Sequence, residues 1–233
     1  MNARAFIRLL GWILLCAGVL VIAWGLVIWR WGDPVTGAYT AWQQHRLDGQ
    51  YARLVETYKP PAQVSPSETP AERRRALRLA AVRFRERAEQ GSAIGRLHVG
   101  RLGLDMVLLN GTDTGTLKKG PGRDARTYMP GEGQLVYIAG HRTTYGAPFA
   151  HIDRMKRGDL VILEMPYGRF RYRVTSSVIV PADDLARLKS HGRELIALQA
   201  CHPRFSARER YIVYAAPAAG FATDAGSLAA PGS

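Results

Sequence analysis

The feature that most constrains this chain is an uncharged apolar run near its N-terminus. Residues 9–29 read LLGWILLCAGVLVIAWGLVIW and contain no charged side chain. At about 1.5 Å per residue, a helix of this length spans the roughly 30 Å hydrocarbon core of a bilayer. A signal peptide would have a shorter apolar core followed by a small-residue cleavage pattern. We therefore predict a transmembrane helix, with residues 1–33 forming a cytoplasmic tip and the membrane span.

The charges around this run indicate its orientation. Arg4 and Arg8 precede the run, and positive side chains favour the cytoplasmic side, whereas Arg30 follows the run and reduces the contrast. We expect a single-pass membrane protein with its N-terminus in the cytoplasm and the rest of the chain outside. The formal net charge of +13 would by itself suit nucleic acid, an anionic membrane or an acidic polymer. An extracytoplasmic position argues against nucleic acid as the partner.

Cysteine usage points to a first functional residue. Cys16 lies inside the predicted membrane span, so Cys201 is the single cysteine of the extracytoplasmic part and has no partner for an intramolecular disulfide. Thiols outside the cytosol tend to oxidise, so an unpaired thiol there is expected to be buried or used. We therefore take Cys201 as a candidate functional residue.

Residues 34–93 are predicted to form an extracytoplasmic linker of mixed composition. A polar, helix-favouring piece at 41–58 precedes the Pro/Ser-rich tract KPPAQVSPSETP, which is typical of a spacer. Residues 71–90 then form a basic amphipathic helix that contains seven arginines. This helix has two interpretations: contact with anionic lipid or wall polymer near the membrane, or packing on the edge of the folded domain.

From residue 94 to residue 216 the apolar period changes from 3.6 to 2, which is typical of half-buried strands. Short strands separated by Gly/Pro turns predict an all-β domain, a closed or nearly closed barrel, with one brief helical piece at 183–189. The tail 217–233 is low in complexity, and we expect it to be disordered. The strand candidates are Leu97 to Val99, Leu102 to Leu108, Leu135 to Ala139, Leu160 to Glu164, Phe170 to Val180, Leu195 to Ala200 and Tyr211 to Ala215.

Three side chains that could carry chemistry lie at predicted strand ends. His141 follows one apolar strand, Cys201 ends another, and Arg210 begins the last. If the last two strands are antiparallel neighbours, Cys201 and Arg210 lie at the same end of the barrel. A histidine can take the proton of a thiol, and an arginine can donate hydrogen bonds to an oxyanion. The simpler alternative is a structural histidine, a buried cysteine and a solvated arginine.

Several motifs between residues 94 and 216 are specific in their wording. They are LKKGPG (117–122), MPGEG (129–133), AGHRTTYGAPF (139–149), RGD (157–159) and CHPRFSARERYIVYA (201–215). With these motifs the chain resembles the sortases, which are cysteine transpeptidases of the bacterial cell envelope, and GHRTTYGAPF resembles the class E sortases most. The resemblance implies an eight-stranded barrel, an N-terminal membrane anchor, and catalysis by His141, Cys201 and Arg210, with Arg208 as the competitor for the third role.

Substrate binding is the second implication of the resemblance. Thr143, Tyr145 and Ala200 are predicted to contact the substrate, although Tyr145 could instead only cap the barrel rim. Sortases usually have a threonine directly before the cysteine, whereas this chain has Ala200. The missing hydroxyl bears on substrate preference and efficiency.

The activity implied by the resemblance has two steps. Cys201 cleaves an LAxTG- or LPxTG-type sorting signal between Thr and Gly and forms a thioester, while His141 protonates the leaving amine and Arg210 stabilises the developing charge. An amine of peptidoglycan or of lipid II then resolves the thioester. The expected partners are secreted proteins with C-terminal sorting signals, and no metal or organic cofactor is required.

Other classes fit less well. An L,D-transpeptidase would carry a Ser-His-Gly-Cys run, and papain-like enzymes place the cysteine before the histidine. A zinc site built from Cys201, His202, His141 or His151 lacks paired ligand spacing. The alternative that stays open is a non-catalytic, membrane-tethered barrel that binds sorting-signal peptides or wall polymer, which Ala200 favours.

Overall fold

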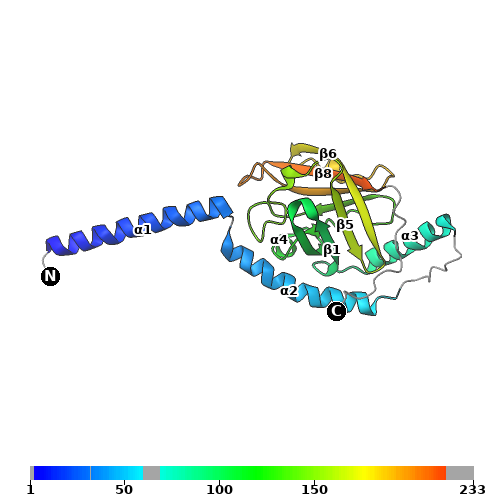
Figure 1. The fold of residues 1–233 in the computed structure, drawn as a ribbon, viewed down its shortest axis with the longest axis horizontal. Helices are drawn as coiled ribbons and strands as arrows, with labels where there is room; N and C mark the ends of the chain where they lie inside the picture. Colours follow the sequence, from blue (N-terminus) through cyan, green and yellow to red (C-terminus); the bar gives the residue numbers. More distant parts are fainter. Residues whose placement is uncertain (1–2, 32, 60–68, 219–233) are drawn as a thin grey trace.

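The computed structural model describes residues 3–31, 33–59 and 69–218 (Figure 1). A long helix, α1 (Ala3–Trp31), extends away from a β-barrel, and two further helices, α2 (Pro34–Thr57) and α3 (Pro70–Arg87), lie against that barrel. The central part of the Pro/Ser-rich tract, 60–68, and most of the predicted disordered tail, 219–233, lie outside the described residues.

Helix α1 contains the predicted membrane span. Its stretch Arg4–Val27 has a mean hydropathy of 2.4, and no residue of its apolar window is buried inside the protein. An apolar helix with no protein covering it needs an apolar environment, and its length suits a bilayer. Among the described residues it is the one helix long and apolar enough to be a candidate membrane span.

Eight strands close into a barrel in the order β1-β2-β3-β4-β7-β8-β6-β5, which confirms the predicted fold class. Two pairs, β2 with β3 and β4 with β7, are parallel, and the other pairs are antiparallel. The strands are β1 (Ala93–Val99), β2 (Leu104–Asn110), β3 (Gly122–Arg123), β4 (Leu135–Ala139), β5 (Leu160–Met165), β6 (Gly168–Pro181), β7 (Leu195–His202) and β8 (Glu209–Pro217).

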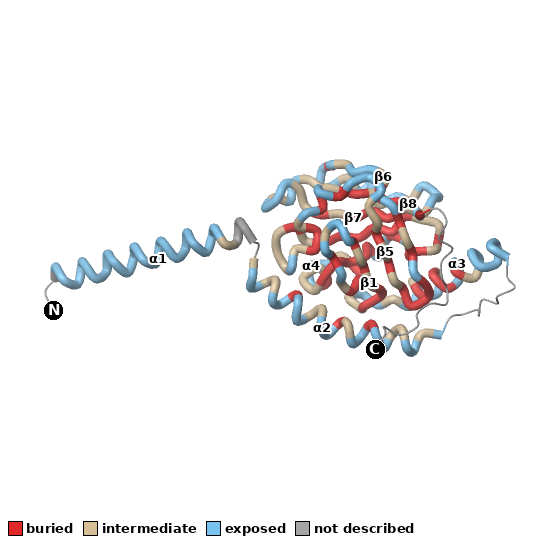
Figure 2. The backbone as a smooth tube through the Cα atoms, viewed as in Figure 1, coloured by how far each residue is buried: buried red, intermediate tan, exposed pale blue. Residues whose placement is uncertain are grey.

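Seven of these strands match the alternating segments of the sequence. Strand β3 was not predicted, because two residues are too short to show a period. The short helical elements are α4 (Thr114–Leu117) and three 3₁₀ turns, one of which, Leu185–Leu188, lies within the helical piece expected at 183–189. The interior is filled by apolar side chains of the strands, and Figure 2 shows this buried core beside the exposed α1.

Helix α3 packs on the barrel. Its residues Leu77, Ala80, Ala81 and Phe84 are buried in the same core as the strands. The helix lies at the end of the molecule away from α1 (Figure 1). Of the two interpretations of the basic helix, the structure therefore supports packing on the edge of the folded domain.

Helix α2 also belongs to the folded domain. The Gln44 side chain accepts a hydrogen bond from Val107 N at 2.7 Å and donates one to Lys119 O at 2.9 Å, and the Tyr51 hydroxyl donates to Glu164 O at 2.9 Å. Leu47 and Tyr51 are buried with residues of β1 and β2. The segment predicted as the first part of a linker is therefore docked on the barrel along its length.

The MPGEG motif supports the barrel. The Glu194 carboxylate accepts hydrogen bonds from Gly131 N and Gly133 N, both at 3.1 Å, and from the Tyr172 hydroxyl at 2.5 Å. Glu132 accepts from Met129 N at 2.8 Å and from Arg85 at 2.9 Å. Because these contacts satisfy the polar groups of the motif, we infer that the motif stabilises the fold.

Candidate active site

His141 is placed by the end of strand β4. Gly140 N donates to Gln199 O at 3.0 Å, which continues the β4–β7 pairing one residue past the strand. A Cβ at position 140 would lie 2.7 Å from the Phe149 ring, so only glycine allows this close packing. The chain then turns, and His141 O accepts from Phe149 N at 3.1 Å. The polar loop that begins at His141 is thus anchored at both ends.

Cys201 and Arg210 are direct partners in the register of β7 and β8. In an antiparallel pair, directly opposed residues have Cα atoms about 4.5–5.5 Å apart and side chains on the same face. The prediction that these strands are antiparallel neighbours is therefore confirmed. Arg208 precedes β8 and has no partner in this register, so the pairing favours Arg210 for the third role.

Strand β7 also brings Cys201 towards His141. Ala139 pairs with Gln199 in the parallel β4–β7 ladder, and His141 and Cys201 each lie two residues beyond that pair. Because side chains alternate with a period of two, the Cys201 side chain lies on the same face of β7 as that of Gln199. The three predicted catalytic residues therefore gather at one end of the barrel, from β7, β8 and the loop after β4.

The environment of His141 favours its neutral form. Burial lowers the pKa of His141 below its ordinary value of 6.5, and the nearby cation of Lys118 lowers it further. Within the described residues, the buried Nε2 atom has no hydrogen-bond partner. The Tyr145 ring lies 5.2 Å from the imidazole, centroid to centroid. A neutral imidazole with an unpaired nitrogen is able to accept a proton from a thiol.

Arg142 is a member of this site that the sequence did not single out. Its side chain is 4% exposed, and Nη1 donates to Cys201 O at 3.3 Å and to His202 Nδ1 at 2.8 Å. Nη2 forms an ion pair with Asp153 at 3.2 Å. The guanidinium thus ties the backbone of Cys201 to the loop after His141. The sequence held one indication that Arg142 belongs to the site, namely its position directly after His141.

The loop after His141 has an unusual backbone. Tyr145, Gly146 and Ala147 have consecutive positive φ angles of 52°, 68° and 40°. Each non-glycine residue in this region costs about 1–2 kcal/mol, so neighbouring structure must hold the loop in place. Tyr145 and Thr143 are both half-buried. Tyr145 contacts His141 directly, which agrees with a position at the site and leaves its predicted substrate contact as a prediction.

The structure corrects the expectation for Ala200. Its side chain is fully buried in the barrel core, and the residue pairs with Tyr211 across β8. Adjacent residues of a strand face opposite sides, so the methyl group of Ala200 points away from the face that carries Cys201. Ala200 is therefore not placed to contact a substrate with its side chain in this structure.

Arg210 is half-buried and is held by its own loop. Its Nη1 donates to Ala207 O at 2.8 Å and to Glu209 O at 3.0 Å. Both contacts are to carbonyl oxygens, and no carboxylate of the described residues pairs with Arg210, so the guanidinium is oriented and keeps its charge. An oriented, charged donor beside a thiol suits the binding of a carbonyl oxygen that becomes negative.

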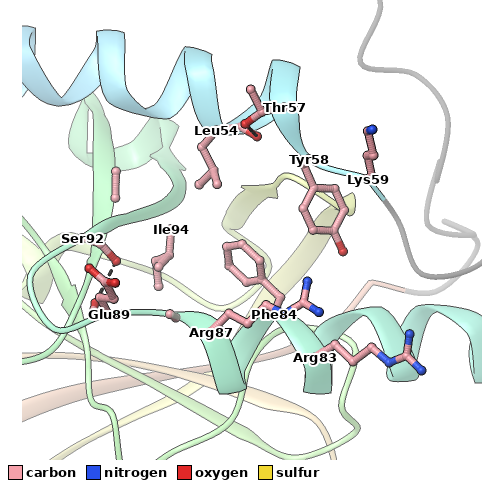
Figure 3. Close-up of a pocket in the computed structure, with 12 residues that line it drawn as sticks. Leu54, Thr57, Tyr58, Lys59, Arg83, Phe84, Arg87, Glu89, Ser92 and Ile94 are labelled. Atoms are coloured by element: carbon pink, nitrogen blue, oxygen red, sulfur yellow. Dashed lines mark hydrogen bonds between the residues drawn. The ribbon is translucent and has the colours of Figure 1, made fainter.

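A cavity of about 600 Å³ lies elsewhere, between the C-terminal ends of α2 and α3 and the start of β1 (Figure 3). Apolar Leu54, Phe84 and Ile94 line it together with the basic Arg83 and Arg87. Its lining includes none of the predicted site residues, so we assign the chemistry to the barrel end. Among the described residues no group of three or more His, Cys, Asp or Glu could hold a metal ion.

A comparison with protein families identifies this arrangement. The Sortase domain model matches residues 97–218 of the 233, just over half of the chain. The chain belongs to the sortase family. The matched region begins in β1 and ends after β8, so it contains the whole set of His141, Cys201 and Arg210.

Two curated sortases are similar in sequence. The chain is 33% identical over 131 residues to Sortase D of Bacillus subtilis and 28% identical over 143 residues to Sortase SrtE1 of Streptomyces coelicolor. Each match covers 54% of this chain, but 64% of the first relative and 40% of the second. The chain thus spans less than two thirds of the length of either relative. Since it resembles a class D and a class E enzyme, class E stays a prediction.

Solved structures agree on the fold. Sortase E1 from Streptomyces coelicolor, determined with a tripeptide in its active site, has a TM-score of 0.52 at 25% identity and covers 56% of this chain and 91% of its own. A Clostridium perfringens sortase D5 has a TM-score of 0.58 at 20% identity and covers 76% of this chain and 98% of its own. The second match shows the fold alone, and the part of this chain that it covers is longer than the barrel.

Proposed function

We propose that this sortase is a membrane-anchored cysteine transpeptidase in which Cys201 is the nucleophile, His141 the acid–base group and Arg210 the oxyanion-binding group. The observation that carries this proposal is the direct pairing of Cys201 with Arg210, at the strand end beside His141. A thiol, a proton acceptor and a fixed cation supply the three functions that acyl transfer through a thioester requires.

The reaction follows from these roles. The Cys201 sulfur attacks the threonine carbonyl of an LAxTG- or LPxTG-type signal, and its proton passes to His141. His141 then protonates the glycine amine as the Thr–Gly bond breaks, which leaves the protein on Cys201 as a thioester. A cell-wall or lipid II amine attacks this thioester and releases the thiol. Arg210 donates hydrogen bonds to the oxyanion in both steps.

The partners follow from the same proposal. The acyl donors are secreted proteins with C-terminal sorting signals, and the acceptors are amines of peptidoglycan or its lipid-linked precursor. The uncovered apolar helix α1 supports a cell-membrane location with a cytoplasmic N-terminus and an extracytoplasmic barrel. We assign no cofactor to the reaction, since every step uses a side chain of the chain itself.

Intact-protein mass spectrometry tests the proposal. The full chain carrying Cys16→Ser, in which Cys201 is the remaining cysteine, is incubated with an LAxTG peptide or an LPxTG peptide and quenched in acid. We expect a gain equal to the peptide truncated after threonine, and its loss on treatment with hydroxylamine. The matched control carries Cys201→Ala in addition. Binding of both peptides without any adduct would instead support the alternative of a non-catalytic barrel.

A further inference from the structure

The start of helix α2 reaches the loop that follows His141. Asp33 caps this helix by accepting from Val35 N at 3.0 Å and from Thr36 N at 3.3 Å. The Thr36 hydroxyl oxygen accepts a hydrogen bond from Tyr145 N at 2.8 Å, across 109 residues of sequence. This contact joins the first turn of α2 to the segment 145–147 of the loop after His141, whose φ angles are positive.

Two neighbouring side chains of α2 reinforce this contact. The Tyr39 ring lies 6.4 Å from the Tyr145 ring, nearly perpendicular to it. A Cβ at Gly146 would lie 3.2 Å from the Thr40 methyl group, so α2 and the loop approach as closely as glycine allows. Residues 36 and 40 are one helical turn apart and share a face. The docked face of α2 therefore continues as far as the catalytic loop.

The same face of α2 also holds Lys118, the residue whose charge lowers the pKa of His141. The Thr40 hydroxyl donates to Lys118 O at 2.9 Å, and Gln44 donates to Lys119 O at 2.9 Å. The Lys118 ammonium lies 5.5 Å from the centre of the Tyr145 ring. The two residues that act on the His141 imidazole, Tyr145 and Lys118, are thus both hydrogen-bonded to α2 through their backbone.

The loop needs such support from outside. Tyr145 and Ala147 both have positive φ angles, a conformation that side chains other than glycine adopt only where the surroundings impose it. Within the loop, Ala147 N donates a hydrogen bond to Thr144 O at 2.9 Å and closes a turn. The Tyr145 N–H instead donates to Thr36 of helix α2. If this donor lost its acceptor, the loop would have a reason to relax away from the left-handed conformation.

We propose that Thr36 is a positioning residue of the active site, whose hydroxyl oxygen, with Tyr39 and Thr40 beside it, holds the loop 143–147 and the Tyr145 ring against His141. The inference deepens the proposed function and rests on it for its catalytic consequence. Helix α2 is then a structural part of the active site, and the segment that leaves α1 sets the geometry of the proton-transfer group.

The titratable and charged groups around His141 come from four elements. They are Lys118 at the end of α4, Arg142 and Tyr145 in the loop after β4, Cys201 on β7 and Arg210 opposite it on β8. Helix α2 contributes no charge to this set, since Thr36, Tyr39 and Thr40 are uncharged. A change at Thr36 therefore acts on His141 through the position of Tyr145 and Lys118.

Three variants of the full chain in detergent test the proposal. Thr36→Val keeps the shape of the side chain but removes the acceptor, Thr36→Ser keeps the acceptor, and Thr57→Val is the matched control on the same helix, since the Thr57 hydroxyl donates to Arg53 O at 2.8 Å within its own helix. We measure kcat and KM for acylation by an LAxTG peptide across pH. We also follow the titration of His141 by NMR with ¹³C-labelled histidine, assigned with His141→Asn.

For Thr36→Val we expect kcat to fall by about 5- to 10-fold, the loss of one hydrogen bond, with little change in KM. The acid limb of the profile and the His141 titration should both move up towards the ordinary histidine value. Thr36→Ser should stay within about twofold of the parent, and Thr57→Val should match it. An unchanged His141 titration in Thr36→Val would overturn the proposal, whether or not the rate falls. If the parent chain forms no thioester, the proposed function fails while the NMR titration still decides the role of Thr36.

Discussion

The two ends of this barrel satisfy their polar groups to very different degrees. At the α3 end, the carboxylates of Glu132 and Glu194 accept several hydrogen bonds each, and α3 itself begins with a capping box between Thr69 and Glu72. At the Cys201 end, two adjacent residues, His141 and Arg142, hold two of the three buried side-chain nitrogens that lack a hydrogen-bond partner within the described residues.

Backbone conformation shows the same contrast. The three non-glycine residues with positive φ among the described residues, Tyr145, Ala147 and Phe205, lie in the loops after β4 and β7 that carry the site. A strained backbone or an unpaired polar group persists in a native protein only where the surrounding structure holds it in place. The well-paired end and the core thus stabilise the fold, while the Cys201 end keeps reactive groups available.

Removal of the His141 imidazole should have the largest effect on activity with little effect on stability. We expect His141→Ala to lower the rate of thioester formation by about 10²- to 10⁴-fold, because the proton acceptor is lost. The free energy of unfolding should change little, since Nε2 has no hydrogen-bond partner among the residues that the structure describes. Peptide acylation and urea denaturation measure the two effects. His151→Ala, at an exposed position, is the control, and an equal loss of rate there would contradict the assignment.

A core change at the other end should have the opposite pattern. Phe84 is buried and packs 5.4 Å from the Tyr167 ring and 5.9 Å from the Tyr58 ring. We expect Phe84→Ala to lower the free energy of unfolding by about 3–5 kcal/mol, because it leaves a cavity. The pH profile of acylation by the folded fraction should not move. Leu79→Ala, an exposed position on the same helix, should cost far less, and equal losses would show that Phe84 is not a core anchor.

Arg142 tests whether the reactive end depends on geometry as well as on charge. A lysine keeps the charge but presents a single ammonium, which cannot reach Cys201 O, His202 and Asp153 as the guanidinium does. We expect Arg142→Lys to lower acylation by about 10- to 100-fold through misplacement of Cys201. The control is Arg154→Lys, at an exposed site. Full activity of Arg142→Lys would exclude a positioning role.

The smallest expected effect concerns protonation of His141. Its folded-state pKa is lowered by burial and by Lys118, so the folded protein binds fewer protons at this site than the unfolded chain. The free energy of unfolding should therefore fall as pH drops below about 6.5, and none of this loss is present well above it. Lys118→Met should raise the pKa of His141 and move the acid limb of acylation to higher pH by a fraction of a unit.

Lys119→Met is the matched control for this change, because Lys119 neighbours Lys118 in the chain and is not among the groups that shift His141. Acylation rates between pH 5 and 8, together with urea unfolding at the same values, measure both consequences. A downward shift of the acid limb in Lys118→Met would contradict the electrostatic explanation.

Prediction from the sequence succeeded where residues close in the chain determine the outcome. Strands β7 and β8 follow one another with a short connection, so they pair, and this places Arg210 opposite Cys201. The apolar positions of the helix at 71–90 were visible as a stripe, but the stripe alone did not say whether lipid or protein covers it. Leu77 and Phe84 turn out to be covered by the barrel core.

By itself, the sequence determined the apolar span of α1, the alternation that makes a barrel, and the residue types that can transfer an acyl group. The tertiary structure decided which distant segments meet: Thr36 with Tyr145, Arg142 with the backbone of Cys201, and α2 with β1 and β2. The physical reason is that hydrophobic periodicity records which side of an element is buried, whereas the partner that covers it depends on how all elements pack together.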